Sequence, residues 1–454
     1  MKKHNRSMLE GPLFSGIISY TIPIILTSVL QLLFNAADLV VVGQFCGGIS
    51  VAAVSSTGPI TKLLVNLFIG LSVGCGVTVA HGLGSKAFDT VHKTIHTAVL
   101  TALVCGVILT FVGVAFSETF LTMMGSPETV LPLSAVYMKI YFGGITFSMV
   151  YNFCAAILRA AGDTKSPLIF LSISGVLNVV LNLIFVTVLH MNVAGVALAT
   201  TISQGLSALL VVIALMRRTD ACKLELKKMR FYGKQLSKII QIGLPAGIQS
   251  SLFSISNVII QSSVNSFGDI FMSGYGAAGE LDCFVYVIMN AFHQTAVNYV
   301  GQNAGAHKYD RVKKTYRICL LTASTFGLVA SLLLYCFGRP LLAIYLPGEM
   351  EAIEYGMIRL MWINLPYFLC GLMDVSTGAL RGMGSSFVPM VISVLGICGI
   401  RITWIYTIFQ MPQFHTPQCL FFSYTISWII TFLLEFMAFQ KVFKKHQRLS
   451  AETA

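Results

Sequence analysis

The segment of residues 20–43 carries the residue types and spacing most suggestive of chemistry. It is an apolar stretch whose few polar residues fall three or four positions apart, so a helix would gather them on one face. They are Ser28, Gln31, Asn35 and Asp38. A membrane helix holds a carboxylate at depth only where it faces protein or water, at a cost of roughly 3 kcal/mol. We therefore expect Asp38 to belong to a transport site.

Further polar residues in the first half of the chain suit the same site. Asn178 and Asn182 lie one helical turn apart, and Thr200 lies one turn before Gln204. Counting about 1.5 Å per residue from each helix end places them at a depth similar to that of Asp38. An acid with amides and a hydroxyl suits either a titrating carboxylate or a small oxygen-liganded cation such as sodium. The alternative is that these side chains only hydrogen-bond between helices.

A substrate cavity would draw polar residues from both halves. In the second half, segment 272–300 is the most polar, and Ile260 occupies the position that matches Asp38. The candidate cavity residues are Gln31, Asn35, Asn257, Asp282, Tyr286, Asn290, Asp374 and Arg401.

Three charged residues near the end of the chain allow structural as well as functional interpretations. Arg401 would lie in the outer half of a membrane, where a buried arginine needs a partner such as Glu280, Asp282 or backbone carbonyls. Asp374 would lie nearer the inside and could serve either structure or function. Glu435 precedes the basic C-terminal residues closely, which predicts an interfacial position.

The composition predicts an integral membrane protein. Hydrophobic residues make up 56% of the chain and charged residues only 11%. The net charge of +12 comes from basic residues between apolar runs, which indicates membrane topology, and no nucleic-acid motif is present. The 11 cysteines form no CxxC pair and resemble small apolar core residues. We expect no cofactor and no metal, apart from a proton or a sodium ion at Asp38.

Twelve apolar segments can be marked along the chain. They cover approximately residues 14–42, 50–80, 95–116, 132–154, 167–189, 193–216, 239–266, 272–300, 316–337, 355–378, 387–408 and 418–440. With the N-terminus inside, most of the 30 Lys and Arg residues fall on the cytoplasmic side, and only Arg339 falls in an outer loop. We expect an all-α, multi-pass protein of a bacterial plasma membrane with both termini in the cytoplasm.

The two halves of the chain repeat each other. The repeat pairs Pro23 with Pro245, Ser28 with Ser250 and Asn35 with Asn257. The stretches LRAAGDTKSP and VAHGLGSKAFDTVHKT recur at nearly the same offset as LRGMGSSFVP and VGQNAGAHKYDRVKKT. Because each half has an even number of segments, we predict two six-helix lobes related by a pseudo-two-fold axis along the membrane normal, around a central cavity.

The hydrophilic segment 217–238 separates these halves. We expect an N-lobe over residues 1–216, a cytoplasmic linker over 217–238 and a C-lobe over 239–454. Pro23 either kinks the first segment and acts as a hinge during transport, or is a tolerated break in the helix.

Twelve segments in two lobes, a proline and an acid on the first segment, and the paired RAAGDTKSP and VGQNAGAHKYDRV loops resemble the multidrug and toxic compound extrusion family. The resemblance covers essentially the full chain. It implies an antiporter, not an enzyme, that exports organic and often cationic compounds as protons or sodium ions enter. We expect the protein to be a monomer. The resemblance assigns the cation site to Asp38, Asn178, Asn182 and Thr200. One branch of the family has a second cation site with acids on helices 7 and 10, but segment 239–266 has no acid.

Two other functions stay open. A flippase for a lipid-linked saccharide or cell-wall precursor could use Arg401 and Lys62 against a pyrophosphate, although only isolated basic residues occur. A channel or receptor would lack coupled transport, and the absence of a large extramembrane domain counts against a receptor. No nucleotide-binding motif is present, which argues against ATP-driven transport within this chain.

Overall fold

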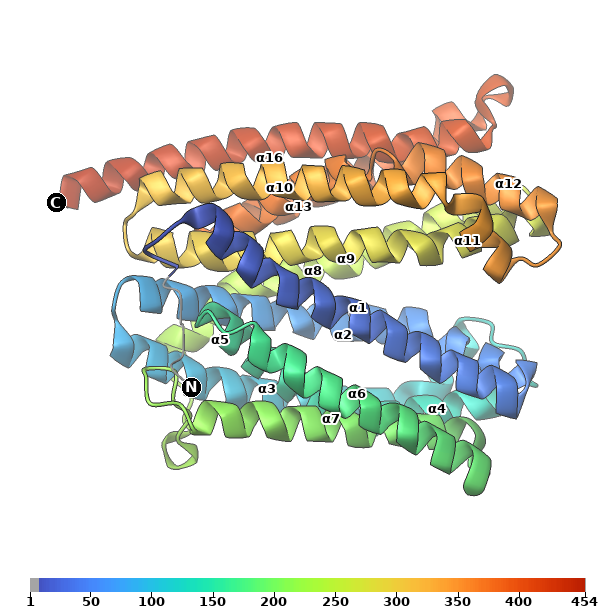
Figure 1. The fold of residues 1–454 in the computed structure, drawn as a ribbon, viewed down its shortest axis with the longest axis horizontal. Coiled ribbons are helices and arrows are strands. Elements are labelled where there is room, and N and C mark those ends of the chain that lie inside the picture. Colours follow the sequence, from blue (N-terminus) through green and yellow to red (C-terminus); the bar gives the residue numbers. More distant parts are fainter. Residues whose placement is uncertain (1–7, 454) are drawn as a thin grey trace. The chain divides into compact units, whose positions relative to one another are not determined.

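A computed structural model describes residues 8–453 of the chain (Figure 1). The described residues form two compact units, and each is named here by its place in the chain. The N unit is Ile22–Gly247, and the C unit joins residues 8–21 to residues 248–453. Each unit is built from long helices joined by short loops.

The N unit takes most of helix α1 (Leu13–Cys46) and the start of α8 (Gly233–Asn265). Between them lie α2 (Gly48–Gly84), α3 (Phe88–Met123), α4 (Leu131–Gly143), α5 (Ile145–Ala160), α6 (Lys165–Leu183), η1 (Ile184–Val188), α7 (Asn192–Met216) and η2 (Leu226–Lys228). The loop after α7 and the beginning of α8 together occupy the segment expected to be a linker.

The C unit takes the first residues of α1 and the remainder of α8. Its other elements are α9 (Asp269–Gly305), α10 (Tyr309–Cys336), α11 (Gly338–Tyr345), α12 (Met350–Arg359), η3 (Leu360–Asn364), α13 (Tyr367–Gly382), α14 (Phe387–Ser393), η4 (Val394–Gly399), α15 (Ile400–Tyr406), η5 (Ile408–Gln410), η6 (Pro412–Phe414) and α16 (Pro417–Thr453). Elements η1, η3 and η4 are π-helical turns that continue a longer helix.

The described helices confirm an all-α membrane fold. Nine of them are long and apolar enough to cross a bilayer, or up to eleven if each of two bent pairs counts as one span. The predicted segment 272–300 lies within α9, which is not among those nine helices. All twelve predicted segments therefore lie in helices. The two-fold axis and the cavity between the lobes stay predictions.

The internal repeat recurs in the packing of each unit. In the N unit, α5 packs against α2, α3 and α7; in the C unit, α13 packs in the same way against α9, α10 and α16. Each central helix is also preceded by a bend, of 46° between α4 and α5 and of 41° between α12–η3 and α13. The two halves thus fold into units of the same plan.

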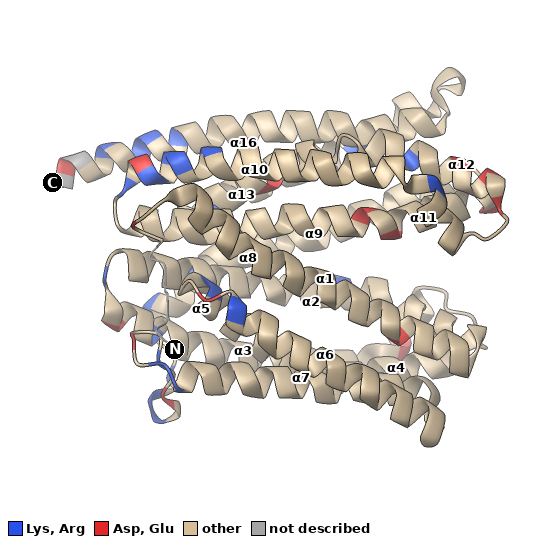
Figure 2. Cartoon of the chain, viewed as in Figure 1, with Lys and Arg blue, Asp and Glu red and all other residues tan. Residues whose placement is uncertain are grey.

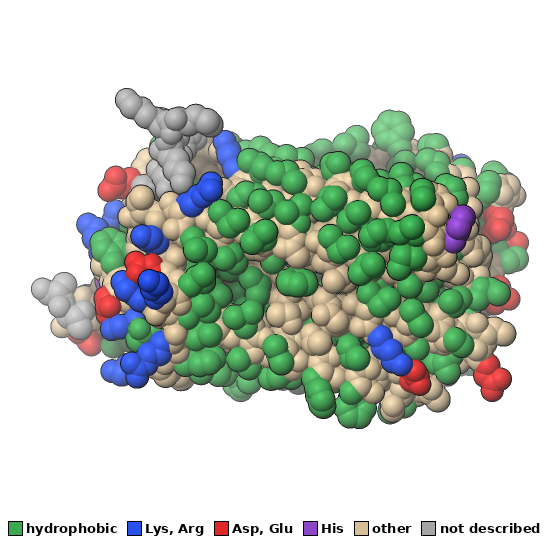
Figure 3. All heavy atoms as spheres, turned by 90° about the horizontal axis from the view of Figure 1, so that it is seen from below, with side chains coloured by type: hydrophobic (Ala, Val, Ile, Leu, Met, Phe, Trp, Pro, Cys, Tyr) green, Lys and Arg blue, Asp and Glu red, His purple; other side chains and the backbone are tan. Residues whose placement is uncertain are grey.

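Large apolar side chains on the outside of the units suit a lipid environment. Phe111, Leu321 and Ile344 are 69% to 75% exposed, and the molecular face in Figure 3 is largely covered by such side chains. Charged residues are concentrated toward helix ends and loops, with few along the middle of the helices (Figure 2). Inside each unit, apolar clusters around α5 and α13 fix the helices that carry the polar residues.

Helices α1 and α8 each pass from one unit into the other beside a proline. The division falls between Thr21 and Ile22 in α1, close to Pro23, and between Gly247 and Ile248 in α8, close to Pro245. The proline pair found in the sequence repeat therefore marks the same place in both helices.

Candidate functional site

The N unit gathers the predicted cation-site residues around one buried carboxylate. Asp38 is 9% exposed and accepts a hydrogen bond from Nδ2 of Asn182 and one of 3.3 Å from the hydroxyl of Thr200. Nδ2 of Asn178 donates to the Thr200 hydroxyl at 3.3 Å, and Nδ2 of Asn182 also lies 3.4 Å from Oδ1 of Asn178. The four residues that sequence spacing suggested therefore form one hydrogen-bonded cluster.

Three helices position this cluster. Asp38 comes from α1, Asn178 and Asn182 from α6, and Thr200 from α7. Helix α1 approaches α6 closely because Gly175 has no side chain: a Cβ there would overlap the ring of Phe34. Phe34 precedes Asp38 by one helical turn, so this close approach brings the carboxylate to the amides of α6.

The polar seam between α6 and α7 continues away from Asp38. The hydroxyl of Ser207 donates to that of Ser174 at 2.5 Å, one turn of α6 before Asn178. Gln204 lies one turn after Thr200, and its Oε1 is buried without a hydrogen-bond partner among the described residues. Polar groups thus follow α6 and α7 over several turns in an otherwise apolar interior.

The cluster has the donor set of a site for one small cation. Within residues 8–453, no lysine or arginine forms an ion pair with Asp38, so its charge has only amide and hydroxyl partners. Oδ1 of Asn182 is buried there and accepts no hydrogen bond from the described part of the chain. A proton on the carboxylate or a sodium ion between these oxygens would satisfy both features.

The candidate cavity residues on α1 and α8 point out of the helix packing. Gln31 and Asn35 are exposed on α1, as Asn257 is on α8. On α9, Tyr286 is 43% exposed, whereas Asn290 is half-buried with its Oδ1 accepting a hydrogen bond of 2.7 Å from Gln294. The side chains of Gln31, Asn35 and Asn257 are therefore accessible to a ligand.

Asp282 does not present a free carboxylate. It is 4% exposed and accepts hydrogen bonds from Nε of Arg359 at 2.9 Å and from Nδ2 of Asn364 at 2.8 Å. Arg359 also stacks 3.9 Å above the ring of Tyr275. Asp282, one of the candidate cavity residues, is thus enclosed by the arginine of α12 and by the π-helical turn η3.

Arg401 has a different partner from those expected. Its Nε donates to the hydroxyl of Ser427 at 2.9 Å, and its guanidinium lies 3.9 Å from the centroid of the Tyr424 ring. The aromatic face stabilises the buried cation, so neither Glu280 nor Asp282 pairs with it. Sequence reasoning considered only acids and carbonyl groups as partners.

Glu435 is fully buried, so the predicted interfacial position is wrong. It is 0% exposed and bonded to α13 and α14 through Thr377 and Ser393. Asp374 of α13 is partly buried, and its Oδ2 has no hydrogen-bond partner in residues 8–453. Glu435 therefore contacts neighbouring helices of the C unit and not solvent or lipid.

Pro23 lies inside α1, two residues after the division between the units. It has no backbone N–H for the preceding turn, and the hydroxyl of Thr27 donates to its carbonyl oxygen at 2.6 Å. The helix is continuous at this point.

Sequence reasoning missed several residues of the polar interior. Tyr137 of α4 lies within electrostatic reach of Asp38, and Arg359 and Glu435 form buried polar contacts in the C unit. The signal available for Arg359 was its place in an apolar segment, where a charge must find a partner. Tyr137 had no such signal, because a tyrosine in an apolar helix is ordinary.

Comparison with protein families matches both halves of the chain. The family model described as MatE matches residues 23–184 and again residues 245–407. The two matches begin at Pro23 and Pro245, the pair that the repeat identified. The same unit of sequence therefore occurs twice.

Curated relatives align over most of the chain. The probable multidrug resistance protein YoeA of Bacillus subtilis is 28% identical over 439 residues, which covers 94% of each chain. The multidrug export protein MepA of Staphylococcus aureus is 22% identical over 386 residues and covers 85% of each chain.

Solved structures share the fold at low sequence identity. A MOP superfamily transporter from Pyrococcus furiosus has a TM-score of 0.92 at 18% identity and covers 98% of this chain and 99% of that chain. An outward-facing multidrug resistance MATE family transporter has a TM-score of 0.90 at 19% identity, covering 99% and 100%. With the family model matching each half, the chain belongs to the MatE family, the multidrug and toxic compound extrusion transporters.

Proposed function

We propose that the protein is a secondary antiporter that exports organic, cationic or amphipathic compounds in exchange for protons or sodium ions. Relatives over most of its length are named as multidrug resistance and multidrug export proteins. Asp38, Asn178, Asn182 and Thr200 form the coupling site. Gln31 and Asn35, which are exposed on the same helix as Asp38, contribute to substrate binding. Small organic molecules and the lipid bilayer are its partners, without nucleic acid.

One observation carries the ion-coupling part of this proposal. The buried carboxylate of Asp38 has only amide and hydroxyl partners, and Oδ1 of Asn182 beside it accepts no hydrogen bond from the described residues. A buried anion without a counter-charge is costly, so a cation that can arrive and leave stabilises this arrangement. The oxygen set accommodates either a proton or a sodium ion.

Cation binding would drive transport by favouring one orientation of the protein. A ligand shifts such an equilibrium only through its different affinity for the two states. In our proposal, a cation that enters from outside occupies Asp38, and the resulting change in α1 lowers the affinity for the exported compound. Pro23, beside the division between the units, would be the hinge, and one solved MATE structure of similar fold is described as bent.

We place the protein in a plasma membrane as a monomer with both termini in the cytoplasm. The distribution of Lys and Arg supports this orientation, because basic residues favour the cytoplasmic side. The organisms of its relatives are bacteria, which supports a bacterial plasma membrane.

A lipid-linked precursor is a less suitable cargo. A pyrophosphate would need arginines free to bind it, yet Arg359 is paired with Asp282, Arg381 is bonded to Gln249, and Arg401 is held by Ser427 and Tyr424. Lys62 is exposed on α2, but a single lysine makes a weak pyrophosphate site. These contacts favour the export of drug-like compounds over a flippase.

Export of a fluorescent cationic dye from proteoliposomes tests the proposal. We expect a proton gradient or a sodium gradient to drive export by the native protein, and the one that does so identifies the coupling ion. Asp38→Asn should remain folded and lose this coupled export. Gradient-driven export by Asp38→Asn at the native rate would refute the role of Asp38, and uncoupled ion flux without dye movement would favour a channel.

A further inference from the structure

The C unit contains a buried carboxyl group that the proposed coupling site does not use. Glu435 of α16 is 0% exposed. Its Oε1 accepts hydrogen bonds of 2.7 Å from the hydroxyl of Thr377 and of 2.6 Å from the hydroxyl of Ser393. Its Oε2 is buried and has no hydrogen-bond partner among residues 8–453. Oε1 therefore accepts two hydrogen bonds from hydroxyl groups, whereas Oε2 accepts none from the described residues.

The helices around Glu435 are arranged to hold this geometry. Thr377 is 2% exposed on α13, the central helix of the unit, and Ser393 is 0% exposed at the end of α14. The π-helical turn η4 begins directly after Ser393, and such turns redirect side chains and are frequent at functional sites. Gly396 in that turn leaves no room for a side chain against Thr431 of α16, so the two helices pack closely beside the acid.

The ionisable neighbours of Glu435 do not neutralise it. Asp374 and Arg381 of α13 lie close enough to Glu435 for their charges to interact with it. Cys370 of α13 and Tyr316 of α10 are its other ionisable neighbours. Arg381 gives its hydrogen bonds to groups other than acids: Nη2 donates to Oε1 of Gln249 at 2.8 Å. The cluster therefore contains two acids but one arginine.

His293 of α9 adds no charge to this cluster. Its Nδ1 lies 2.7 Å from the backbone carbonyl oxygen of Asp374, so this nitrogen must donate. Its Nε2 lies 3.4 Å from Nη1 of Arg381, which can only donate, so Nε2 must accept. A histidine that donates from one nitrogen and accepts at the other is neutral.

Charge balance then determines the protonation of the cluster. If Asp374 and Glu435 were both ionised, Arg381 would balance one of them and a second buried anion would be left without a counter-charge. Protonation of one acid removes this imbalance. Glu435 is the more deeply buried acid, and a proton on its unbonded Oε2 leaves Oε1 as the carbonyl oxygen that accepts from both hydroxyls.

We propose that Glu435 is a second cation site of this transporter, in the C unit, which binds one exchangeable proton in balance with Asp374 and Arg381. The site is separate from the Asp38 cluster, all of whose members belong to the N unit. Each lobe would then carry one titrating carboxyl group. The sequence repeat did not predict this, because the helix of the C unit that matches α1 carries Ile260 in place of the acid.

Infrared difference spectroscopy of the full-length protein in lipid, recorded over a series of pH values, tests the proposal without measuring transport. A protonated carboxyl group gives a C=O stretching band that disappears when it ionises. We expect the native protein to show such a band that titrates, Glu435→Gln to lack it, and Asp38→Asn to keep it. Failure of Asp38-dependent export would leave this result unaffected, so the two proposals can fail separately.

Asp374→Asn is the second arm of the experiment. With Asp374 neutral, Arg381 balances Glu435, so the Glu435 band should disappear at a lower pH than in the native protein. Glu435→Gln keeps an oxygen for the Thr377 and Ser393 hydroxyls, and thermal unfolding checks its folding. The proposal is overturned if Glu435→Gln and the native protein give the same spectra, if the band does not titrate, or if sodium at constant pH removes it. An unchanged midpoint in Asp374→Asn would overturn the balance between the two acids.

Discussion

Nδ2 of Asn182 on α6 donates a hydrogen bond to the carboxylate of Asp38 on α1. The two residues lie far apart in the sequence, and their contact brings the first helix of the N unit against the fifth predicted segment. Because Nδ2 donates to Asp38, the carbonyl oxygen Oδ1 of the same amide has no hydrogen-bond partner among residues 8–453 and, in our proposal, is the oxygen that receives a cation. In our proposal, the orientation of one amide thus links helix packing to ion binding.

Asn182→Asp should make the site retain a proton at higher pH. Two carboxylates in contact cannot both ionise without strong repulsion, so one proton stays bound until the solution is more alkaline. The pH optimum of dye export by Asn182→Asp should therefore move upward relative to the native protein. Dye export from proteoliposomes over a series of internal and external pH values measures this shift.

Asn182→Ala is the matched control for that experiment. It removes the hydrogen bond to Asp38 without adding a charge, so it should weaken export without an upward shift of the optimum. An identical pH profile for Asn182→Asp and the native protein would show that residue 182 does not face the titrating group during transport.

The cluster could be predicted because helical spacing determines which side chains of one helix share a face, and because the family resemblance pointed to the four residues of the site. Asn178 and Asn182 are one turn apart, and equal depth in a membrane limits which residues of other helices they can meet. The partner of Asp282 could not be predicted in this way. Arg359 and Asn364 lie on α12 and the π-helical turn η3, and both the π turn and the 41° bend change the direction of side chains from the regular helical pattern.

Gly175→Ala should separate α1 from α6 and weaken the site without unfolding the protein. The added Cβ would overlap the ring of Phe34, which must then move together with the part of α1 that carries Asp38. We expect a loss of about 1–3 kcal/mol in the free energy of unfolding, and a larger relative loss of coupled export. Thermal unfolding and dye export measure the two effects.

Phe34→Leu tests whether this steric contact is the cause. Combined with Gly175→Ala, the smaller side chain should recover much of the lost stability, because the overlap is relieved. Equal losses in the single Gly175→Ala variant and in the double variant would show that the ring of Phe34 is not what the new methyl group meets.

The prediction that Glu435 lies at the membrane interface failed because its distance from the basic residues along the helix does not show which helices cover it. Glu435 lies six residues before Lys441, which is only about 9 Å along a helix. Helices α13 and α14 cover α16 at this depth, so the acid is enclosed although basic residues follow soon after. A one-dimensional pattern locates the end of a span but does not show which neighbouring helices extend to it.

Thr21 and Thr295 should show a coupling energy in a double-mutant cycle. Their hydroxyl oxygens lie 2.8 Å apart inside the C unit, where the start of α1 packs on α9. Replacing either by Val leaves the other hydroxyl without this partner, at a cost of about 1 kcal/mol. Thermal unfolding of the two single variants and the double variant should give a coupling of about 0.5–1.5 kcal/mol. Strictly additive losses would show that this hydrogen bond does not stabilise the first turns of α1.

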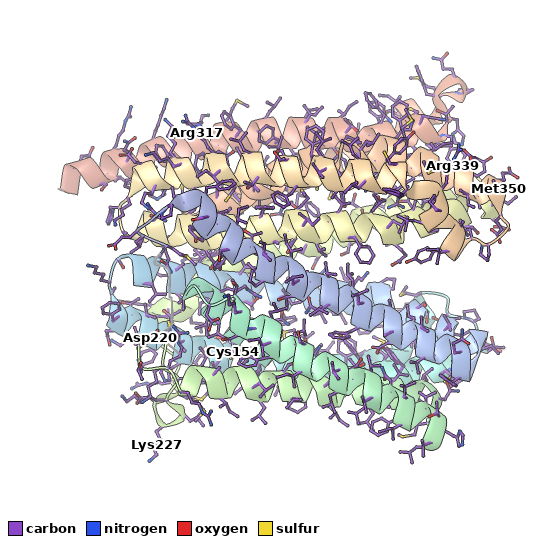
Figure 4. The ribbon with its side chains drawn as sticks, in the orientation of Figure 1. Cys154, Asp220, Lys227, Arg317, Arg339 and Met350 are labelled. Carbon is purple, nitrogen blue, oxygen red and sulfur yellow. The ribbon has the colours of Figure 1, made fainter. Side chains whose placement is uncertain are left out.

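The loop after α7 should stabilise the protein in a pH-dependent way through Asp220, which Figure 4 labels outside the long helices. Burial raises the pKa of Asp220, but hydrogen bonds and charge from Arg218 outweigh it and leave the pKa below its usual value of about 4. Nε of Arg218 lies 2.9 Å from Oδ1 of this acid. Because the folded-state pKa is the lower one, the stabilisation is complete above about pH 4 and disappears as the pH falls through the folded-state pKa.

The difference in Tm between the native protein and Asp220→Asn should therefore be largest near neutral pH and shrink in acid. Asp89→Asn, which removes an exposed pair with Lys93, is the control and should change the Tm little at any pH, because water and salt screen exposed ion pairs. A difference in Tm for Asp220→Asn that stays constant in acid would contradict a role for its charge.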